Sequence, residues 1–295
     1  MMNVPGGAAS VTLVSGRLDR YMTRPAATKG PYGTGRVIAG VFVLIFSCLI
    51  VLVVAGSVLA IGQDPSPTMQ VLRIGLPLSL WWLVVWAIAK VMFSMSLADI
   101  LSWRPGLRWG LLGRSVAVAG VIFAAYWGYK IAQSDKPVVT SSAVMIALLL
   151  ALVMISLQAS AEELVFRGFG PQIVLGKTGF SPAVFWVVSA GFSVLFALLH
   201  GASNAAMFGF YVVMALILAA LVWRTAGLEA AFALHLVFNL TSQGSGLLLG
   251  QDLTKESATP TATELLTLIA LSVVAAVAMA VVARGADAKG TISGP

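Results

Sequence analysis

Long apolar runs dominate the chain after residue 36 and restrict what it can fold into. Each run is close to the about 20 residues that an α-helix needs to cross the hydrocarbon core of a bilayer. The eight runs are approximately Val37–Ile61, Leu76–Leu97, Ser115–Ala132, Ser142–Phe166, Pro182–His200, Asn204–Trp223, Leu228–Leu248 and Ala262–Val282. The sequence therefore predicts an all-α, polytopic integral membrane protein with about eight transmembrane helices.

The composition excludes a soluble globular protein. Of the 295 residues, 59% are hydrophobic and only 10% are charged, whereas a soluble domain carries roughly 25% charged residues. The excess of 18 Lys and Arg over 11 Asp and Glu is explained by loop charges that orient membrane helices. We therefore expect a multi-pass protein of a cell membrane, with a bacterial plasma membrane favoured. Its expected partner is the lipid bilayer, with no nucleic acid.

The placement of Lys and Arg predicts the orientation of the helices. With the N-terminus inside, thirteen of these residues fall on the inner side and four on the outer side, Lys90 within a run being left out. The inner residues are Arg17, Arg20, Arg24, Lys29, Arg36, Arg104, Arg108, Arg114, Arg167, Lys177, Arg224, Arg284 and Lys289. The outer residues are Arg73, Lys130, Lys136 and Lys255. Positive charge concentrates on the cytoplasmic side, so both termini are predicted to be cytoplasmic.

Three regions follow from the distribution of apolar residues. Residues 1–36 are rich in Gly, Pro, Ala and Arg and are predicted to form a mostly disordered cytoplasmic arm. This arm lacks the apolar stretch of a signal peptide, so we expect it to be uncleaved. Residues 37–284 form the predicted membrane-embedded domain, and residues 285–295 form a predicted flexible C-terminal tail.

Two adjacent acids, Glu162 and Glu163, interrupt one apolar run. Ionisable groups in a membrane usually face a cavity, a partner or a substrate. Glu163 and Arg167 are four residues apart, so they share a helix face and can form a structural pair. Glu162 points elsewhere and is free to face a polar cavity as a general base. Glycines and a proline that can break this helix follow at Gly168, Gly170 and Pro171.

The only two histidines, His200 and His235, also lie in apolar runs. His235 and Asn239 are four residues apart, so both can direct hydrogen-bond donors to one oxygen, as an oxyanion hole requires. We expect Glu162, His200, His235 and Asn239 to converge on one wet pocket within the bilayer.

Three motifs in separate apolar segments resemble those of a known family. They are Glu-Glu-x-x-x-Arg at 162–167, Phe-x-x-x-His at 196–200 and His-x-x-x-Asn at 235–239. Together they resemble the CPBP family of intramembrane proteases, which includes the type II CAAX prenyl endopeptidases and the bacteriocin-processing, Abi-like proteins. The resemblance covers residues 142–243, which would carry the catalytic core.

The resemblance implies a role for each motif residue. Glu162 and His200 would activate a water molecule for attack on a peptide carbonyl, and His235 and Asn239 would stabilise the oxyanion. Glu163 and Arg167 would hold the helices in register, with Phe196 as further structural support.

Members of this family are also described as metalloproteases, so zinc is the alternative cofactor. Glu162, His200 and His235 could supply three ligands and leave one position for water. We favour a mechanism without a cofactor, because no His-x-x-x-His spacing preorganises two ligands on one helix.

The predicted function is therefore an intramembrane endopeptidase that acts on membrane-associated proteins or peptides, in CAAX-type or in bacteriocin- or pheromone-like processing. Two alternatives stay open. One is a non-proteolytic membrane scaffold or immunity protein that retains the motifs for folding. The other is a proton-coupled transporter, because intramembrane Glu and His also serve as proton relays. The substrate, the oligomeric state and the membrane face to which the cavity opens are left undetermined.

Overall fold

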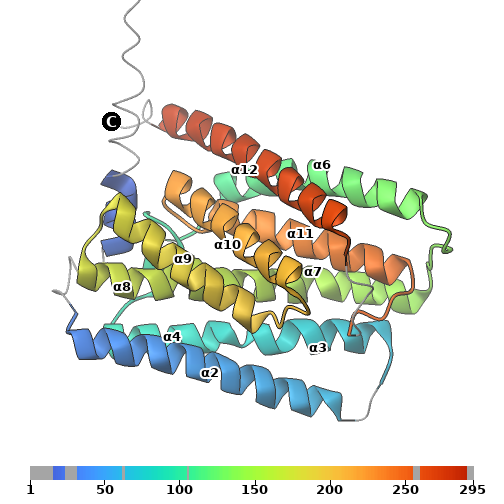
Figure 1. Ribbon diagram of the computed structural model, residues 1–295, viewed down its shortest axis with the longest axis horizontal. Helices are drawn as coiled ribbons and strands as arrows, with labels where there is room; N and C mark the ends of the chain where they lie inside the picture. Colours follow the sequence, from blue (N-terminus) through green and yellow to red (C-terminus); the bar gives the residue numbers. More distant parts are fainter. Residues whose placement is uncertain (1–15, 24–31, 62–63, 105, 255–259, 291–295) are drawn as a thin grey trace, which may run out of the picture.

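The computed structural model describes residues 16–23, 32–61, 64–104, 106–254 and 260–290. It is a bundle of long helices that run roughly side by side (Figure 1). The elements in chain order are α2 (Thr34–Ala60), α3 (Pro67–Ser79), α4 (Trp81–Phe93), α5 (Leu97–Leu101), α6 (Trp109–Ala132), α7 (Ser142–Glu163), the π-helix η1 (Leu164–Phe169), α8 (Gly170–Thr178), α9 (Pro182–Leu199), α10 (Ala205–Thr225), α11 (Glu229–Leu248) and α12 (Ala262–Gly290). The predicted all-α architecture is confirmed.

Seven helical segments of the described chain are long and apolar enough to cross a membrane. They are Thr34–Ala60, Pro67–Phe93, Trp109–Ala132, Ser142–Thr178, Pro182–Leu199, Ala205–Thr225 and Ala262–Arg284. The eighth expected span corresponds to α11, which has 20 residues but is not among the seven. Its second half, from Asn239 to Leu248, carries several polar residues and glycines, and α11 packs against α6, α7 and α10. The protein is thus polytopic, and α11 packs among the helices that could span the membrane.

Polar side chains set the start of four long helices. The residue before each helix accepts a hydrogen bond from the backbone N–H three positions on, which satisfies one of the unpaired amides of the first turn. These capping residues are Ser66, Ser141, Ser181 and Asn204. Proline follows two of them, at the first helical position, where its missing N–H removes no bond.

The second span begins earlier than predicted, at Pro67 instead of Leu76, because Ser66 caps it. This span consists of α3 and α4, which meet at Leu80. Gly75 in α3 permits close packing on α7, since a Cβ there would lie 2.7 Å from Cβ of Met154. The hydropathy pattern therefore missed the first part of this span, the residues before Leu76, although α3 packs closely on α7.

The helix that carries Glu162 does not break after Phe166, although Gly168, Gly170 and Pro171 follow. It changes to π geometry over Leu164–Phe169 and then continues as α8 to Thr178. Pro171 stands in the first turn of α8, where its missing N–H is best tolerated. All six residues of η1 are buried, so packing holds the helix together through this segment. Such π segments frequently occur at functional sites.

Part of the predicted disordered arm is folded. Residues 16–23 form a short helix, seen as the dark blue coil in Figure 1, and Leu18, Tyr21 and Met22 are fully buried. The Tyr21 hydroxyl donates a 2.6 Å hydrogen bond to the carbonyl of Ile100. The apolar residues of this helix are too few to resemble a span, yet enough to dock on the bundle. Residues 1–15 and 24–31 lie outside the described chain.

The C-terminal tail also differs from the prediction in part. Helix α12 continues to Gly290, so residues 285–290 are helical instead of forming a flexible tail. Residues 291–295 lie outside the described chain. The cytoplasmic location of both termini stays a prediction.

Candidate active site

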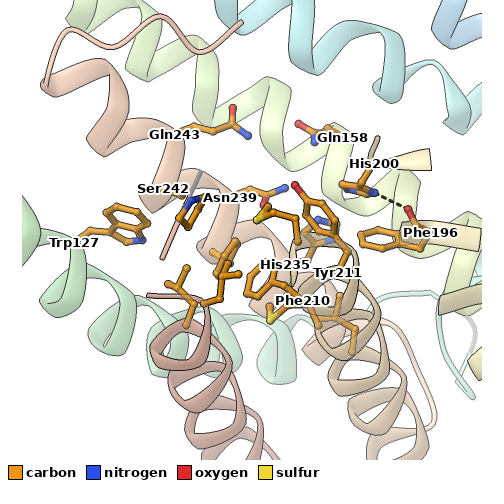
Figure 2. Close-up of a pocket in the computed structure, with 17 residues that line it drawn as sticks. Trp127, Gln158, Phe196, His200, Phe210, Tyr211, His235, Asn239, Ser242 and Gln243 are labelled. Atoms are coloured by element: carbon orange, nitrogen blue, oxygen red, sulfur yellow. Dashed lines mark hydrogen bonds between the residues drawn. The ribbon is translucent and has the colours of Figure 1, made fainter. Parts of the chain in front are cut away.

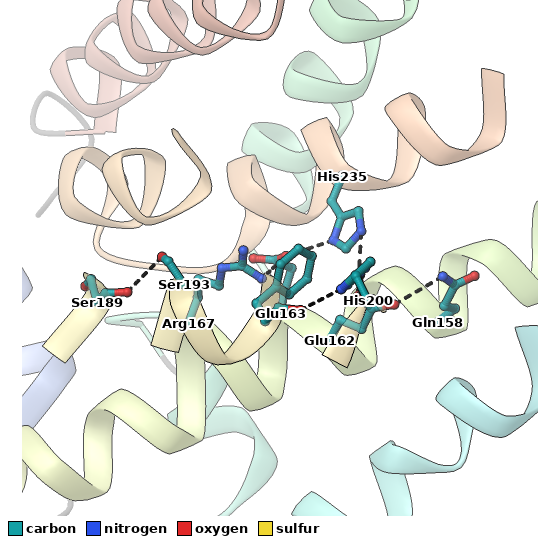
Figure 3. Close-up of polar contacts among 9 residues, drawn as sticks. Gln158, Glu162, Glu163, Arg167, Ser189, Ser193, His200 and His235 are labelled. Carbon is teal, nitrogen blue, oxygen red and sulfur yellow. Dashed lines mark hydrogen bonds and ion pairs between the residues drawn. The ribbon is translucent and has the colours of Figure 1, made fainter. Parts of the chain in front are cut away.

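Glu162 and Glu163 end α7 and are almost completely buried, with exposed fractions of 1% and 0%. Their carboxylates make different contacts (Figure 3). Neighbouring helical residues differ in direction by about 100°, which explains how two adjacent acids reach different partners. The two acids thus make separate contacts, while the roles predicted for them stay predictions.

Glu163 joins two helices through one oxygen. Its Oε1 accepts a hydrogen bond from Arg167 Nη1 at 3.1 Å and lies 2.8 Å from His235 Nδ1 on α11. Arg167 is also buried, and its guanidinium lies over the Phe196 ring at 4.4 Å from the centroid. The predicted Glu163–Arg167 contact is present, and Glu163 additionally holds His235, which the spacing alone did not indicate.

Glu162 faces both histidines. Its Oε2 lies 3.7 Å from Nε2 of His200 and 3.9 Å from Nε2 of His235. Its other oxygen accepts a hydrogen bond from Gln158 Nε2 at 3.1 Å. Oε2 is buried and has no hydrogen-bond partner within the described chain. A carboxylate oxygen in that state costs free energy, so its position between two imidazoles calls for a functional explanation.

His200 stands at the C-terminal end of α9, where the chain leaves the helix. Its Nδ1 lies 2.7 Å from the carbonyl oxygen of Phe196. A carbonyl can only accept, so Nδ1 carries the proton and, in the neutral ring, Nε2 presents its lone pair toward Glu162. Phe196 and Tyr211 pack on the ring, with centroid distances of 4.0 Å and 4.7 Å. Phe196 therefore orients His200 through both its carbonyl and its ring.

A cavity of about 350 Å³ opens beside the two histidines (Figure 2). Its walls come from α6, α7, α9, α10, α11 and α12 together with Pro260. His200, His235 and Asn239 line it, and most of the remaining lining is apolar or aromatic. Glu162 lies directly behind the two histidines. The structure thus brings together all four residues expected to converge, from α7, α9 and α11, while their catalytic roles stay predictions.

Two polar residues of this site were missed in the sequence. Gln158 binds Glu162 and lines the cavity, and Gln243 lines it from α11. Gln158 lies four residues before Glu162, and Gln243 lies four residues after Asn239, so each extends a known polar face by one turn. A search for amides at this spacing in apolar runs would have found both.

The described residues give no support for a zinc site. Among the described residues, no group of three or more His, Cys, Asp or Glu side chains is arranged to hold a metal ion. Ligand atoms of tetrahedral zinc lie about 3.3 Å apart for bonds of 2.0–2.1 Å, which is closer than Glu162 lies to either imidazole. The metalloprotease interpretation is therefore unsupported, and no reaction step is assigned to a metal.

Comparison with known proteins gives one match. The family model of the Rce1-like type II CAAX prenyl endopeptidases matches residues 142–241. Neither the curated proteins nor the solved structures contain a match to the chain. The matched segment runs from the start of α7 into α11 and contains all three motifs. Residues 142–241 are thus similar to the Rce1-like type II CAAX prenyl endopeptidases, and this match supports a CPBP family intramembrane protease.

Proposed function

We propose that the protein hydrolyses peptide bonds of membrane-associated proteins or peptides, with Glu162 and His200 activating the water. The observation that carries this proposal is the buried Oε2 of Glu162, which lacks a hydrogen-bond partner within the described chain and faces two imidazole nitrogens beside a cavity. The carboxylate and the lone pair of His200 Nε2 are both proton acceptors. A water molecule has two protons to donate and suits this pair.

In the proposed reaction, Glu162 and His200 take a proton from the water as its oxygen bonds to the carbonyl carbon. The carbonyl oxygen becomes the oxyanion of a tetrahedral intermediate. When the intermediate collapses, the C–N bond breaks and the abstracted proton passes to the leaving nitrogen. The products are a carboxylic acid and an amine, and transfer of the acid's proton to the amine gives a carboxylate and an ammonium group, so atoms and charge balance without a cofactor.

His235 and Asn239 are proposed to stabilise the oxyanion. Nδ1 of His235 faces Glu163, so its Nε2 can donate only when the ring carries both protons. Glu162 and Glu163 flank the ring with two negative charges, and Arg167 balances one of them. The contact with Glu163 fixes the orientation of the His235 ring. The amide of Asn239, one turn further along α11, adds a second donor at the cavity wall.

The test is a comparison of membrane-protein cleavage in cells that produce the wild type, Glu162→Gln, or Glu264→Gln as a control. Glu264 forms a half-exposed ion pair with Lys130 and does not line the cavity. We expect a set of new protein termini in the wild type and the control, and none of them with Glu162→Gln. Unchanged cleavage by purified Glu162→Gln would refute the proposed mechanism. If the wild type and Glu162→Gln give the same set of termini, and cells that produce the variant behave as wild-type cells do, the scaffold or immunity alternative is favoured.

The substrate class is proposed from the family alone. CAAX-type processing follows the description of the matching family, and bacteriocin- or pheromone-like peptides are the second class. The identified termini distinguish the two, because CAAX-type cleavage gives the retained protein a new C-terminus beside a modified cysteine, whereas leader removal gives the retained peptide a new N-terminus.

A further inference from the structure

A second cavity, of about 400 Å³, lies between α10 and α12, which pack side by side (Figure 1). It is separate from the candidate active site and shares no lining residue with it. Its lining is apolar except at one end, where Arg224 of α10 and Arg284 of α12 both contribute. The apolar lining residues are Ile217, Ala220, Leu221, Val273, Ala276, Val277, Ala280 and Val281. We call this cavity the α10–α12 groove.

A smaller basic pocket adjoins the arginine end of the groove. It has a volume of about 210 Å³, and its cationic lining residues are Arg104, Arg108 and Arg114. Thr225 and Ala283 also line it, and they are the sequence neighbours of Arg224 and Arg284. The two cavities are therefore adjacent, with five arginines around their common region.

Only one of these five arginines has an acidic partner among the side chains that the structure describes. Arg108 forms a bidentate ion pair with Glu229. Among the side chains that the structure describes, which in α12 end at Arg284, no acid forms an ion pair with the remaining four arginines, which are Arg104, Arg114, Arg224 and Arg284. Like charges held close together repel one another, and a bound anion removes that repulsion. Arginine is also well suited to phosphate, because its planar guanidinium can donate two parallel hydrogen bonds.

We infer that the α10–α12 groove and the adjoining basic pocket bind an anionic phospholipid. One acyl chain occupies the groove, and the phosphate lies between Arg224 and Arg284, with the rest of the headgroup toward the basic pocket. A molecule that joins a hydrocarbon chain to an anion matches both halves of the site, whereas a neutral lipid matches only the groove. The arginines lie on the side predicted to be cytoplasmic, and basic pockets between helices on that side recognise anionic headgroups.

The test uses the purified full chain in detergent micelles, with phosphatidylglycerol and phosphatidylcholine of identical acyl chains as probes. Native mass spectrometry measures how much of each lipid stays bound. We expect a preference for phosphatidylglycerol that falls roughly tenfold or more in the double variant Arg224→Gln/Arg284→Gln. The matched control, Arg73→Gln/Lys136→Gln, removes two charges at the opposite end of the bundle and should keep the preference. Equal preference in both double variants would overturn the inference and leave the arginines as orientation signals only.

A second variant tests the groove without changing charge. Ala280→Trp fills the groove, so it should also lower phosphatidylglycerol binding, while circular dichroism reports whether the helices are retained. Soluble glycerol phosphate, which has no acyl chain, should not displace the lipid at equal concentration. If glycerol phosphate competes equally and Ala280→Trp binds as the wild type does, the site recognises free phosphate and the lipid assignment is wrong.

Discussion

The contact between Glu163 and Arg167 predicts that removing one side chain destabilises the protein more than removing both. Both side chains are buried, with exposed fractions of 0% and 3%. Removing one partner of a buried pair leaves an uncompensated charge, which typically destabilises a protein by about 3–5 kcal/mol. Glu163→Leu also removes the acceptor of His235 Nδ1, and an unsatisfied buried donor adds about 1–3 kcal/mol. The single variant should therefore be severely destabilised.

The double variant Glu163→Leu/Arg167→Met should recover most of the loss, because no unpaired charge stays buried. Only the missing acceptor of His235 persists, so we expect the double variant to be about 3 kcal/mol more stable than Glu163→Leu. The difference is more than a hundredfold in the unfolding equilibrium constant. Stability should recover without cleavage activity, because His235 still lacks the carboxylate that orients its ring.

The assay is denaturant unfolding of the purified variants in detergent micelles, followed by circular dichroism. The control is Glu264→Leu, whose pair with Lys130 has both side chains 38% exposed and should change stability by at most about 1 kcal/mol. A double variant no more stable than Glu163→Leu would refute the assignment of a buried charge pair. Full cleavage activity in the double variant would show that the Glu163–His235 contact is not needed.

Three further outcomes are expected. Gln158→Leu should lower the turnover rate about tenfold with little change in KM, because it removes the bond that positions Glu162; an unchanged rate would contradict this role. Arg108→Gln should destabilise the protein by about 3–5 kcal/mol, since Glu229 is fully buried and both its oxygens bind Arg108; unfolding measurements that show no loss would refute it. Metal chelators should leave cleavage intact, and a loss that zinc restores would favour the metal mechanism instead.

Local patterns accounted for much of the fold and for the choice of site residues. Apolar runs of bilayer length predicted the long helices, because crossing a membrane depends on length and composition alone. Ionisable residues are rare in such runs, so Glu162, Glu163, His200 and His235 stood out without any structure. The contact of Glu163 with Arg167 was also predictable, since one helical turn brings residues four apart together.

Tertiary packing decided what no local pattern encodes. The early start of α3 had a local signal in Ser66 and Pro67, which the hydropathy pattern did not weigh. The pairing of Glu163 with His235, 72 residues away, had none, because it depends on how α7 and α11 lie against each other. The π segment keeps its helix unbroken through glycines because surrounding residues bury it, and residues 16–23 are ordered by the bundle on which they dock. The sequence by itself thus determined where most of the long helices form and which ionisable residues are candidates for chemistry. Only the assembled bundle determined which of those residues meet, since distances between helices are set by the shapes of the surfaces that pack together.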